Sequence, residues 1–233
     1  MARTFAIGDI HGHLSKLRKL LGQLRERAAS GDTLLFLGDY VDRGPDSRGV
    51  IDLVLELQQG GWDGPVVALS GNHEVLMLDS LSGRPVMEED WLRNGGWDTM
   101  SSYTSGAPTG RWTTFVPPGH REFLASLRTW YEDEHAIYVH AGIPPGTPVA
   151  RASDDDLLWI REPFLESDYA WEKVVVFGHT PQYEPPTTLI LDREKLPWRP
   201  LNRPEKIGID TGAAYGGPLT AVMLPEREFF SAR

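Results

Sequence analysis

Side chains that can bind metal ions recur in five short segments of this 233-residue chain, each directly after an apolar run. The segments read Gly8-Asp9-Ile10-His11-Gly12, Gly38-Asp39-Tyr40-Val41-Asp42-Arg43-Gly44, Gly71-Asn72-His73-Glu74, His140-Ala141-Gly142 and Gly178-His179-Thr180. A lone Gly-Asp is an ordinary turn, and a lone histidine is usually a structural polar residue. Five such segments after five apolar runs instead predict one shared metal centre.

The spacing assigns the ligands to two sites. Asp9 and His11 are two residues apart, so on an extended segment both side chains point the same way. Asp39 has two carboxylate oxygens and can bridge two ions. The second site is completed by three later residues, Asn72, His140 and His179. Mixed imidazole and carboxylate ligands favour Mn²⁺, with Fe, Zn, Co or Ni as alternatives, over Mg²⁺ or Ca²⁺.

The apolar runs that must position these ligands have strand length and are nearly continuous, as in strands buried on both faces. They are Thr4–Ile7, Thr33–Leu37, Val66–Leu69, Ala136–Val139, Lys173–Phe177, Lys206–Ile209 and Leu219–Leu224. Helical patterns at residues 14–24 and 50–57 separate the early runs. This order predicts an α/β (α+β) fold with two stacked mixed sheets flanked by helices, and ligands at the carboxyl ends of the strands.

Residues from about 80 to 130 have a different pattern, with tryptophans and glycines in place of strand-like runs. We interpret them as a mostly helical insertion with an irregular loop. Whether this insertion forms a lid, a substrate-facing wall or a plain structural excursion stays open. The rest of residues 1–233 is expected to form the single domain that carries it.

Composition limits the possible functions. The formal net charge of −10 disfavours a broad nucleic-acid binder, and binding of divalent cations would consume part of that charge. The chain has no cysteine, which excludes disulfides, thiolate metal sites and cysteine nucleophiles. No run approaches the roughly 20 apolar residues of a membrane span, and no signal peptide is evident. We therefore expect a cytoplasmic protein without membrane or nucleic-acid partners.

The order of the five segments resembles that of the metallophosphoesterases of the phosphoprotein phosphatase family, with the calcineurin-like fold. The similarity is greatest to the small bacterial and phage serine/threonine phosphatases, and Gly208-Ile209-Asp210-Thr211-Gly212 extends it. The resemblance implies that Asp9, His11 and Asp39 hold one metal and that Asp39, Asn72, His140 and His179 hold the other. It implies further roles for four residues: His73 as general acid, Asp42 as its orienting carboxylate, and Arg43 and Arg161 as phosphate-binding arginines.

These residue types suit phosphoryl transfer on physical grounds. Two divalent ions lower the pKa of a shared water, and the resulting bridging hydroxide can attack phosphorus directly. The planar forks of Arg43 and Arg161 can each bind two phosphoryl oxygens. His73 can protonate the leaving alkoxide, and a hydrogen bond from His73 to the Asp42 carboxylate would fix its tautomer and favour the imidazolium.

The predicted function is therefore a metal-dependent phosphomonoester hydrolase, specifically a serine/threonine protein phosphatase acting on a phosphoprotein or small phosphoester. One alternative is a symmetrical diadenosine tetraphosphate hydrolase, for which tryptophans of the insertion could form a base-holding wall. Family members of that type tend to carry alanine where this chain has Asp42, which favours the phosphatase. A second alternative is an inactive metal-dependent binding module.

Overall fold

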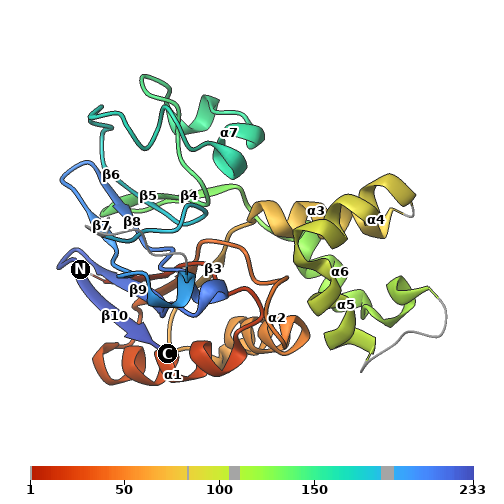
Figure 1. Ribbon diagram of the computed structural model, residues 1–233. Helices are drawn as coiled ribbons and strands as arrows, with labels where there is room; N and C mark the ends of the chain where they lie inside the picture. The colour runs from red at the N-terminus through yellow and green to blue at the C-terminus, as the bar shows by residue number, and fades with distance from the viewer. Residues whose placement is uncertain (1, 83, 105–110, 185–191) are drawn as a thin grey trace.

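The computed structural model describes residues 2–82, 84–104, 111–184 and 192–233. It consists of two five-stranded sheets with helices around them (Figure 1), in the orders β10-β9-β1-β2-β3 and β4-β5-β6-β8-β7. A core of apolar side chains from both sheets lies between them, including Leu35 of one sheet and Val176 of the other. The predicted pair of stacked mixed sheets is confirmed.

The first sheet has a parallel centre, in which β1, β2 and β3 run side by side, and antiparallel β9 and β10 on the other side of β1. Its strands are β1 (Thr4–Ile7), β2 (Thr33–Phe36), β3 (Val66–Ala68), β9 (Leu219–Leu224) and β10 (Glu228–Ala232). The second sheet has parallel β5, β6 and β8 between antiparallel edge strands β4 and β7. Its strands are β4 (Trp130–Glu132), β5 (Ala136–Val139), β6 (Val174–Phe177), β7 (Leu201–Asn202) and β8 (Lys206–Gly208).

Two helices connect the strands of the first sheet: α1 (Leu14–Arg27) and α2 (Ser47–Glu56). The four leucines buried by α1 recur at helical spacing, as the sequence pattern predicted. Between β3 and β4 the chain forms the helical segment, defined as α3 (Asn72–Leu81), α4 (Pro85–Trp91), α5 (Trp97–Thr104) and α6 (Pro118–Ser126). It projects to one side of the sheets in Figure 1. The short α7 (Asp154–Trp159) lies between β5 and β6.

The seven strands expected from apolar runs are all present, within one or two residues at each end. The three missed strands, β4, β7 and β10, are all edge strands of their sheets. Their residues are half-buried or exposed apart from Ala232, so their sequences lack a continuous apolar run. Residues 105–110, where part of the irregular loop was expected, lie outside the described residues. The single-domain assignment and the status of the helical segment as an insertion stay predictions.

Among the described residues no helix is both long and apolar enough to cross a membrane. The cytoplasmic location stays a prediction.

Candidate dinuclear metal centre

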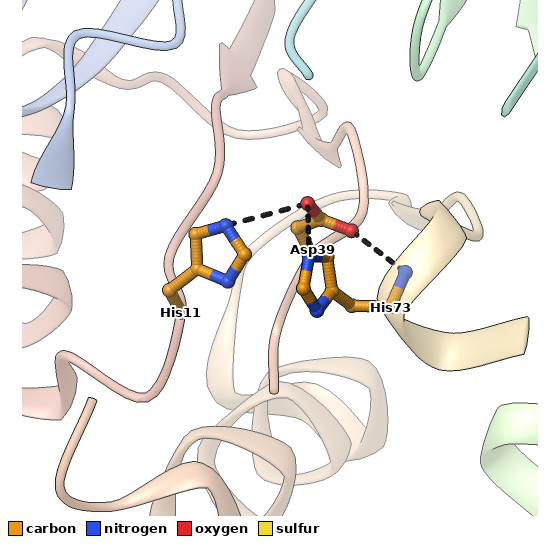
Figure 2. A group of neighbouring side chains, drawn as sticks. All are labelled: His11, Asp39 and His73. Atoms are coloured by element: carbon orange, nitrogen blue, oxygen red, sulfur yellow. Dashed lines mark hydrogen bonds and ion pairs between the residues drawn. The ribbon is translucent and has the colours of Figure 1, made fainter. Parts of the chain in front are cut away.

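Asp39, directly after β2, lies at the centre of the polar cluster. Its Oδ2 is 3.3 Å from His11 Nε2 and 4.0 Å from His73 Nε2 (Figure 2). Its Oδ1 is 3.5 Å from His140 Nε2. Potential ligand atoms of His11, Asp39 and His73 all lie within 4.8 Å of one another, and those of Asp9, Asp39 and His140 form a second such group. The two groups share Asp39, as a carboxylate between two ions would require, but they divide the other residues differently from the predicted sets, with His73 beside His11 and Asp9 beside His140.

The imidazoles of His11 and His140 are held in the tautomer that a metal ligand needs. Each Nδ1 lies 2.9 Å from a backbone carbonyl oxygen, that of Val41 for His11 and that of Leu37 for His140. Since a carbonyl only accepts, each Nδ1 carries the hydrogen and each Nε2 presents its lone pair towards Asp39.

Asn72 and His179 lie beside His140 of the second group. The Oδ1 atom of Asn72 lies 3.0 Å from His140 Nε2 and 2.9 Å from His179 Nδ1. With the hydrogen of His140 on Nδ1, its Nε2 and the Asn72 oxygen are two acceptors facing each other, a contact that a shared cation makes favourable. The backbone N–H of His179 donates to both carboxylate oxygens of Asp9, at 3.1 and 3.0 Å. All six predicted ligands therefore converge.

The protonation states of these groups also fit divalent cations. Burial and the nearby carboxylates raise the pKa of Asp9 and of Asp39 well above their usual range. Burial lowers the pKa of His140 to about 3 and that of His179 to about 2. Neutral imidazoles beside crowded carboxylates form a donor set that a divalent ion would satisfy, since it supplies positive charge to the carboxylates and accepts the nitrogen lone pairs.

Backbone strain is concentrated at this centre. Six non-glycine residues among those described have a positive φ, and five belong to the predicted site. These five are His11 (46°), Asp39 (53°), Asp42 (72°), Arg43 (67°) and His179 (60°). The left-handed region is unfavourable for residues with a Cβ and persists where the surroundings enforce it.

Glu74 is one part of those surroundings, and the sequence reasoning did not assign it a role. This fully buried carboxylate accepts hydrogen bonds at 2.8 Å from the backbone N–H groups of Asp39, Tyr40 and Gly71. It thereby joins the loop after β2 to the N-terminus of α3. Gly71 is required there because a Cβ would overlap the Asp39 carboxylate. The signal available in the sequence was a carboxylate directly before the apolar stretch Val75–Leu78 of α3.

His73 and Asp42 form a close pair, as predicted. His73 Nδ1 lies 2.6 Å from Asp42 Oδ2. Asp42 also accepts hydrogen bonds from Trp91 Nε1 and, at 2.8 Å, from Thr99 Oγ1, two residues of the helical segment that the sequence did not single out. Burial raises the pKa of Asp42 to about 7 and lowers that of His73 to about 3. Burial thus opposes the imidazolium that Asp42 was expected to favour.

A cavity of about 420 Å³ opens onto the cluster. Arg43 and Arg161 both line it together with Asp39, so the two predicted phosphate-binding arginines share one space with the candidate ligands. Arg43 Nη1 also lies 2.8 Å from His11 Nε2.

Part of the cavity lining is aromatic, but the expected tryptophans do not form it. Trp91 and Trp112 of the helical segment are buried and stack on each other at 4.5 Å. Among the described residues, the aromatic side chains that line the cavity are Tyr183, Trp198 and Tyr215, which come from other parts of the chain.

Comparison with known proteins identifies the family. A model of the calcineurin-like phosphoesterases matches residues 2–183, a stretch that contains all six candidate ligands. The chain belongs to this family.

The curated relatives of this calcineurin-like phosphoesterase include proteins named as protein phosphatases and proteins named as dinucleoside tetraphosphatases. Serine/threonine-protein phosphatase 1 of Salmonella typhimurium is 29% identical over 93% of this chain and 89% of its own. The asymmetrical bis(5'-nucleosyl)-tetraphosphatase PrpE of Oceanobacillus iheyensis is 30% identical over 97% of this chain and 90% of its own. The alternative considered from the sequence was the symmetrical type, whereas these named tetraphosphatases are asymmetrical.

Solved structures confirm the fold of this phosphoesterase. A proposed diadenosine tetraphosphatase superposes with a TM-score of 0.70 at 23% identity, over 99% of this chain and 93% of its own. A cold-active protein-tyrosine phosphatase of a psychrophilic Shewanella superposes with a TM-score of 0.62 at 17% identity, over 100% of this chain and 81% of its own. At these identities the likeness concerns the fold alone.

Proposed function

We propose that this calcineurin-like phosphoesterase is a two-metal phosphomonoesterase, with phosphoserine and phosphothreonine in proteins as its leading substrates. One observation carries the proposal: one cavity is lined by three residues of the ligand cluster, by His73 with Asp42 bonded behind it, and by two arginines. A binding module without activity would not require a paired acid beside the ligands.

Two divalent cations would be held on either side of Asp39. Asp9 and His11 would complete one set of ligands, and the other would consist of Asn72, His140 and His179. When bound, such ions activate a water for attack and neutralise charge on phosphoryl oxygens. Mn²⁺ is the proposed metal because the ligands mix oxygen and imidazole nitrogen.

The side chains of the cavity supply the remaining steps. Arg43 and Arg161 bind the non-bridging phosphoryl oxygens and orient the phosphorus towards the ligand cluster. His73 transfers a proton to the leaving oxygen, because its Nε2 faces the cluster while Nδ1 is bonded to Asp42. Asp42 fixes the ring orientation of His73. Because its raised pKa of about 7 lets Asp42 hold a proton against Nδ1, the neutral ring keeps its hydrogen on Nε2, and the Asp42 proton moves to Nδ1 as the Nε2 proton leaves.

Asymmetrical hydrolysis of dinucleoside tetraphosphates is the second candidate. The names of the PrpE relatives support it, and so does the aromatic side of the cavity. The catalytic groups serve either substrate, since both reactions transfer a phosphoryl group to water.

Side-by-side turnover tests the proposal. Mn²⁺-loaded protein would be assayed with p-nitrophenyl phosphate, a phosphoserine peptide and diadenosine tetraphosphate. Turnover of the first two with higher kcat/KM for the peptide than for the dinucleotide supports the leading candidate. A preference for diadenosine tetraphosphate, with ATP and AMP as products, replaces it by the second. The absence of turnover with all three substrates would contradict the proposal that this protein is a phosphoesterase.

A further inference from the structure

The cavity has a second half that the phosphoryl chemistry does not use. We call it the aromatic wall and define it as Tyr183, Trp198 and Tyr215 with Arg193. All four residues line the same cavity as Asp39 and His73. A substrate whose phosphate lies at the ligand cluster can therefore reach the wall without leaving the cavity.

The rings of the wall pack against one another. Trp198 and Tyr215 are nearly parallel, with an interplanar angle of 14° and centroids 6.4 Å apart. Tyr183 packs edge-on against Trp198 at 5.9 Å, and 45% of its surface is exposed. The Arg193 guanidinium lies 4.7 Å from the Tyr215 ring centroid. Flat rings with a guanidinium beside them are the groups on which planar heterocycles stack.

The charges of the cavity point to a polyanion. Among the described residues, Arg43, Arg161 and Arg193 line the cavity and none has a carboxylate within 4.0 Å, although the whole chain carries a net charge of −10. Nearby exposed cations are paired, as Lys195 is with Asp192 at 3.0 Å. Arg43 and Arg161 suffice for the reacting phosphoryl group. Arg193, stacked on Tyr215 on the wall side, is available to a further phosphate.

We propose that the aromatic wall is a nucleobase subsite, which lets this centre take nucleoside polyphosphates in addition to phosphomonoesters. The base stacks on the wall, Arg193 binds a phosphate of the chain, and the terminal part of that chain lies at Arg43 and Arg161. A phosphoserine side chain supplies neither a planar heterocycle nor a linked second phosphate at this position. This inference rests on the proposed phosphohydrolase function and adds to it the residues that hold the nucleoside of its second candidate substrate.

Binding, measured without turnover, tests the subsite. Calorimetry would compare β,γ-methylene ATP with methylenediphosphonate, which carries the same kind of non-hydrolysable linkage without a nucleoside. The wall predicts that wild-type protein binds the nucleotide about tenfold more tightly than the diphosphonate, as expected for base stacking on aromatic side chains. Equal affinities would overturn the proposal.

Substitutions test whether the residues of the aromatic wall cause the preference for the nucleotide over the diphosphonate. In Tyr183→Ala and Trp198→Leu the nucleotide should lose most of its advantage while diphosphonate binding stays within about twofold of wild type. Arg193→Gln should weaken nucleotide binding by about tenfold, in the range of a lost charge-assisted hydrogen bond. Tyr169→Ala and Lys195→Gln are matched controls, because both side chains are exposed and neither lines the cavity. They should bind the nucleotide as wild type does.

The failures of the two proposals are distinguishable. Selective nucleotide binding by a protein that hydrolyses no phosphoester would contradict the proposed function and leave the subsite in place. Hydrolysis of p-nitrophenyl phosphate without selective nucleotide binding would contradict the subsite alone. If Trp198→Leu does not fold, the exposed Tyr183 carries the test. Equal weakening of nucleotide and diphosphonate in Tyr183→Ala would also overturn the subsite.

Discussion

The indole N–H of Trp91 donates to both carboxylate oxygens of Asp42, at 3.0 and 3.1 Å, from a position 49 residues later in the chain. Trp91 is fully buried at the end of α4, and Asp42 is fully buried in the loop after β2. Thr99 in α5 adds a second hydrogen bond and accepts one at 2.7 Å from the backbone N–H of Asp42. The helical segment therefore positions the carboxylate that positions His73.

We expect Thr99→Val to lower kcat by roughly 10-fold or more, because Asp42 loses a charge-assisted hydrogen bond and holds His73 less firmly. Bound metal should stay at the wild-type level, since Thr99 contacts no candidate ligand. Steady-state kinetics and metal analysis check this expectation, and Thr99→Ser should recover most of the activity. A loss that Thr99→Ser fails to restore would argue against a role for the hydroxyl. Trp91→Phe, compared with the 60%-exposed control Trp97→Phe, tests the other hydrogen bond.

His73→Ala should retain both metals but slow the chemical step, by roughly 10²-fold or more for an alkyl phosphate. The loss should be smaller with p-nitrophenyl phosphate, because nitrophenolate leaves without needing a proton. The ratio of kcat values for the two substrates, in variant and wild type, is the measurement. Equal losses for both substrates would contradict the general-acid role.

Asp39→Asn should abolish turnover and reduce metal occupancy, because the bridging carboxylate is removed. Asp63→Asn is a suitable control, since Asp63 is exposed and distant in sequence from every candidate ligand. Elemental analysis and p-nitrophenyl phosphate turnover would be measured on the same samples. Wild-type activity with two retained metals in Asp39→Asn would contradict the bridging role.

Glu74→Gln should lower the free energy of unfolding by about 2–4 kcal/mol, since an amide N–H₂ would face backbone donors where a carboxylate oxygen now accepts. Chemical denaturation of metal-free protein measures this effect separately from metal binding. The exposed Glu172→Gln is the control. An unchanged midpoint in Glu74→Gln would show that this carboxylate does not stabilise the loop after β2.

The stability of the metal-free protein should fall as the pH rises from about 6.5 to about 7.5, because of the buried carboxyls. Burial raises the pKa of Asp42 and Glu74 to about 7, whereas the unfolded chain releases these protons near pH 4. In this interval the folded state binds more protons, so rising pH favours unfolding. The site histidines offset this only in part, since they are neutral in the folded state and the unfolded chain loses most of its histidine protons across the same interval.

Calorimetric Tm values at the two ends of this pH interval, with EDTA and with Mn²⁺, check the dependence. Mn²⁺ should raise Tm most at the higher pH, because the ions replace the protons that the carboxyls have lost. A Tm of the EDTA-treated protein that rises with pH across this interval would contradict the expectation.

The strands and the candidate ligands could be predicted from the sequence because both are marked by residues that are adjacent in the chain. Each buried strand is a short apolar run, and each ligand follows its run directly, as Asp39 follows β2. The contacts that sequence reasoning missed join distant segments. Nothing near Trp91 or Thr99 in the sequence indicates Asp42, because the packing of α4 and α5 against the loop after β2 brings them together. Trp198 and Tyr215 likewise meet only through the tertiary fold.

The pKa of His73 shows a second limit of sequence reasoning. A carboxylate partner was expected to favour the imidazolium, but burial acts in the opposite direction and dominates. The extent of burial depends on helices that pack over the site, and a motif of four residues does not contain that information.

Anomalous diffraction from crystals grown with Mn²⁺ tests the central claim most directly. We predict two manganese peaks on opposite sides of the Asp39 carboxylate, one ligated by Asp9 and His11 and the other by Asn72, His140 and His179. A single peak, or peaks at a distance from Asp39 in crystals saturated with Mn²⁺, would contradict a dinuclear centre.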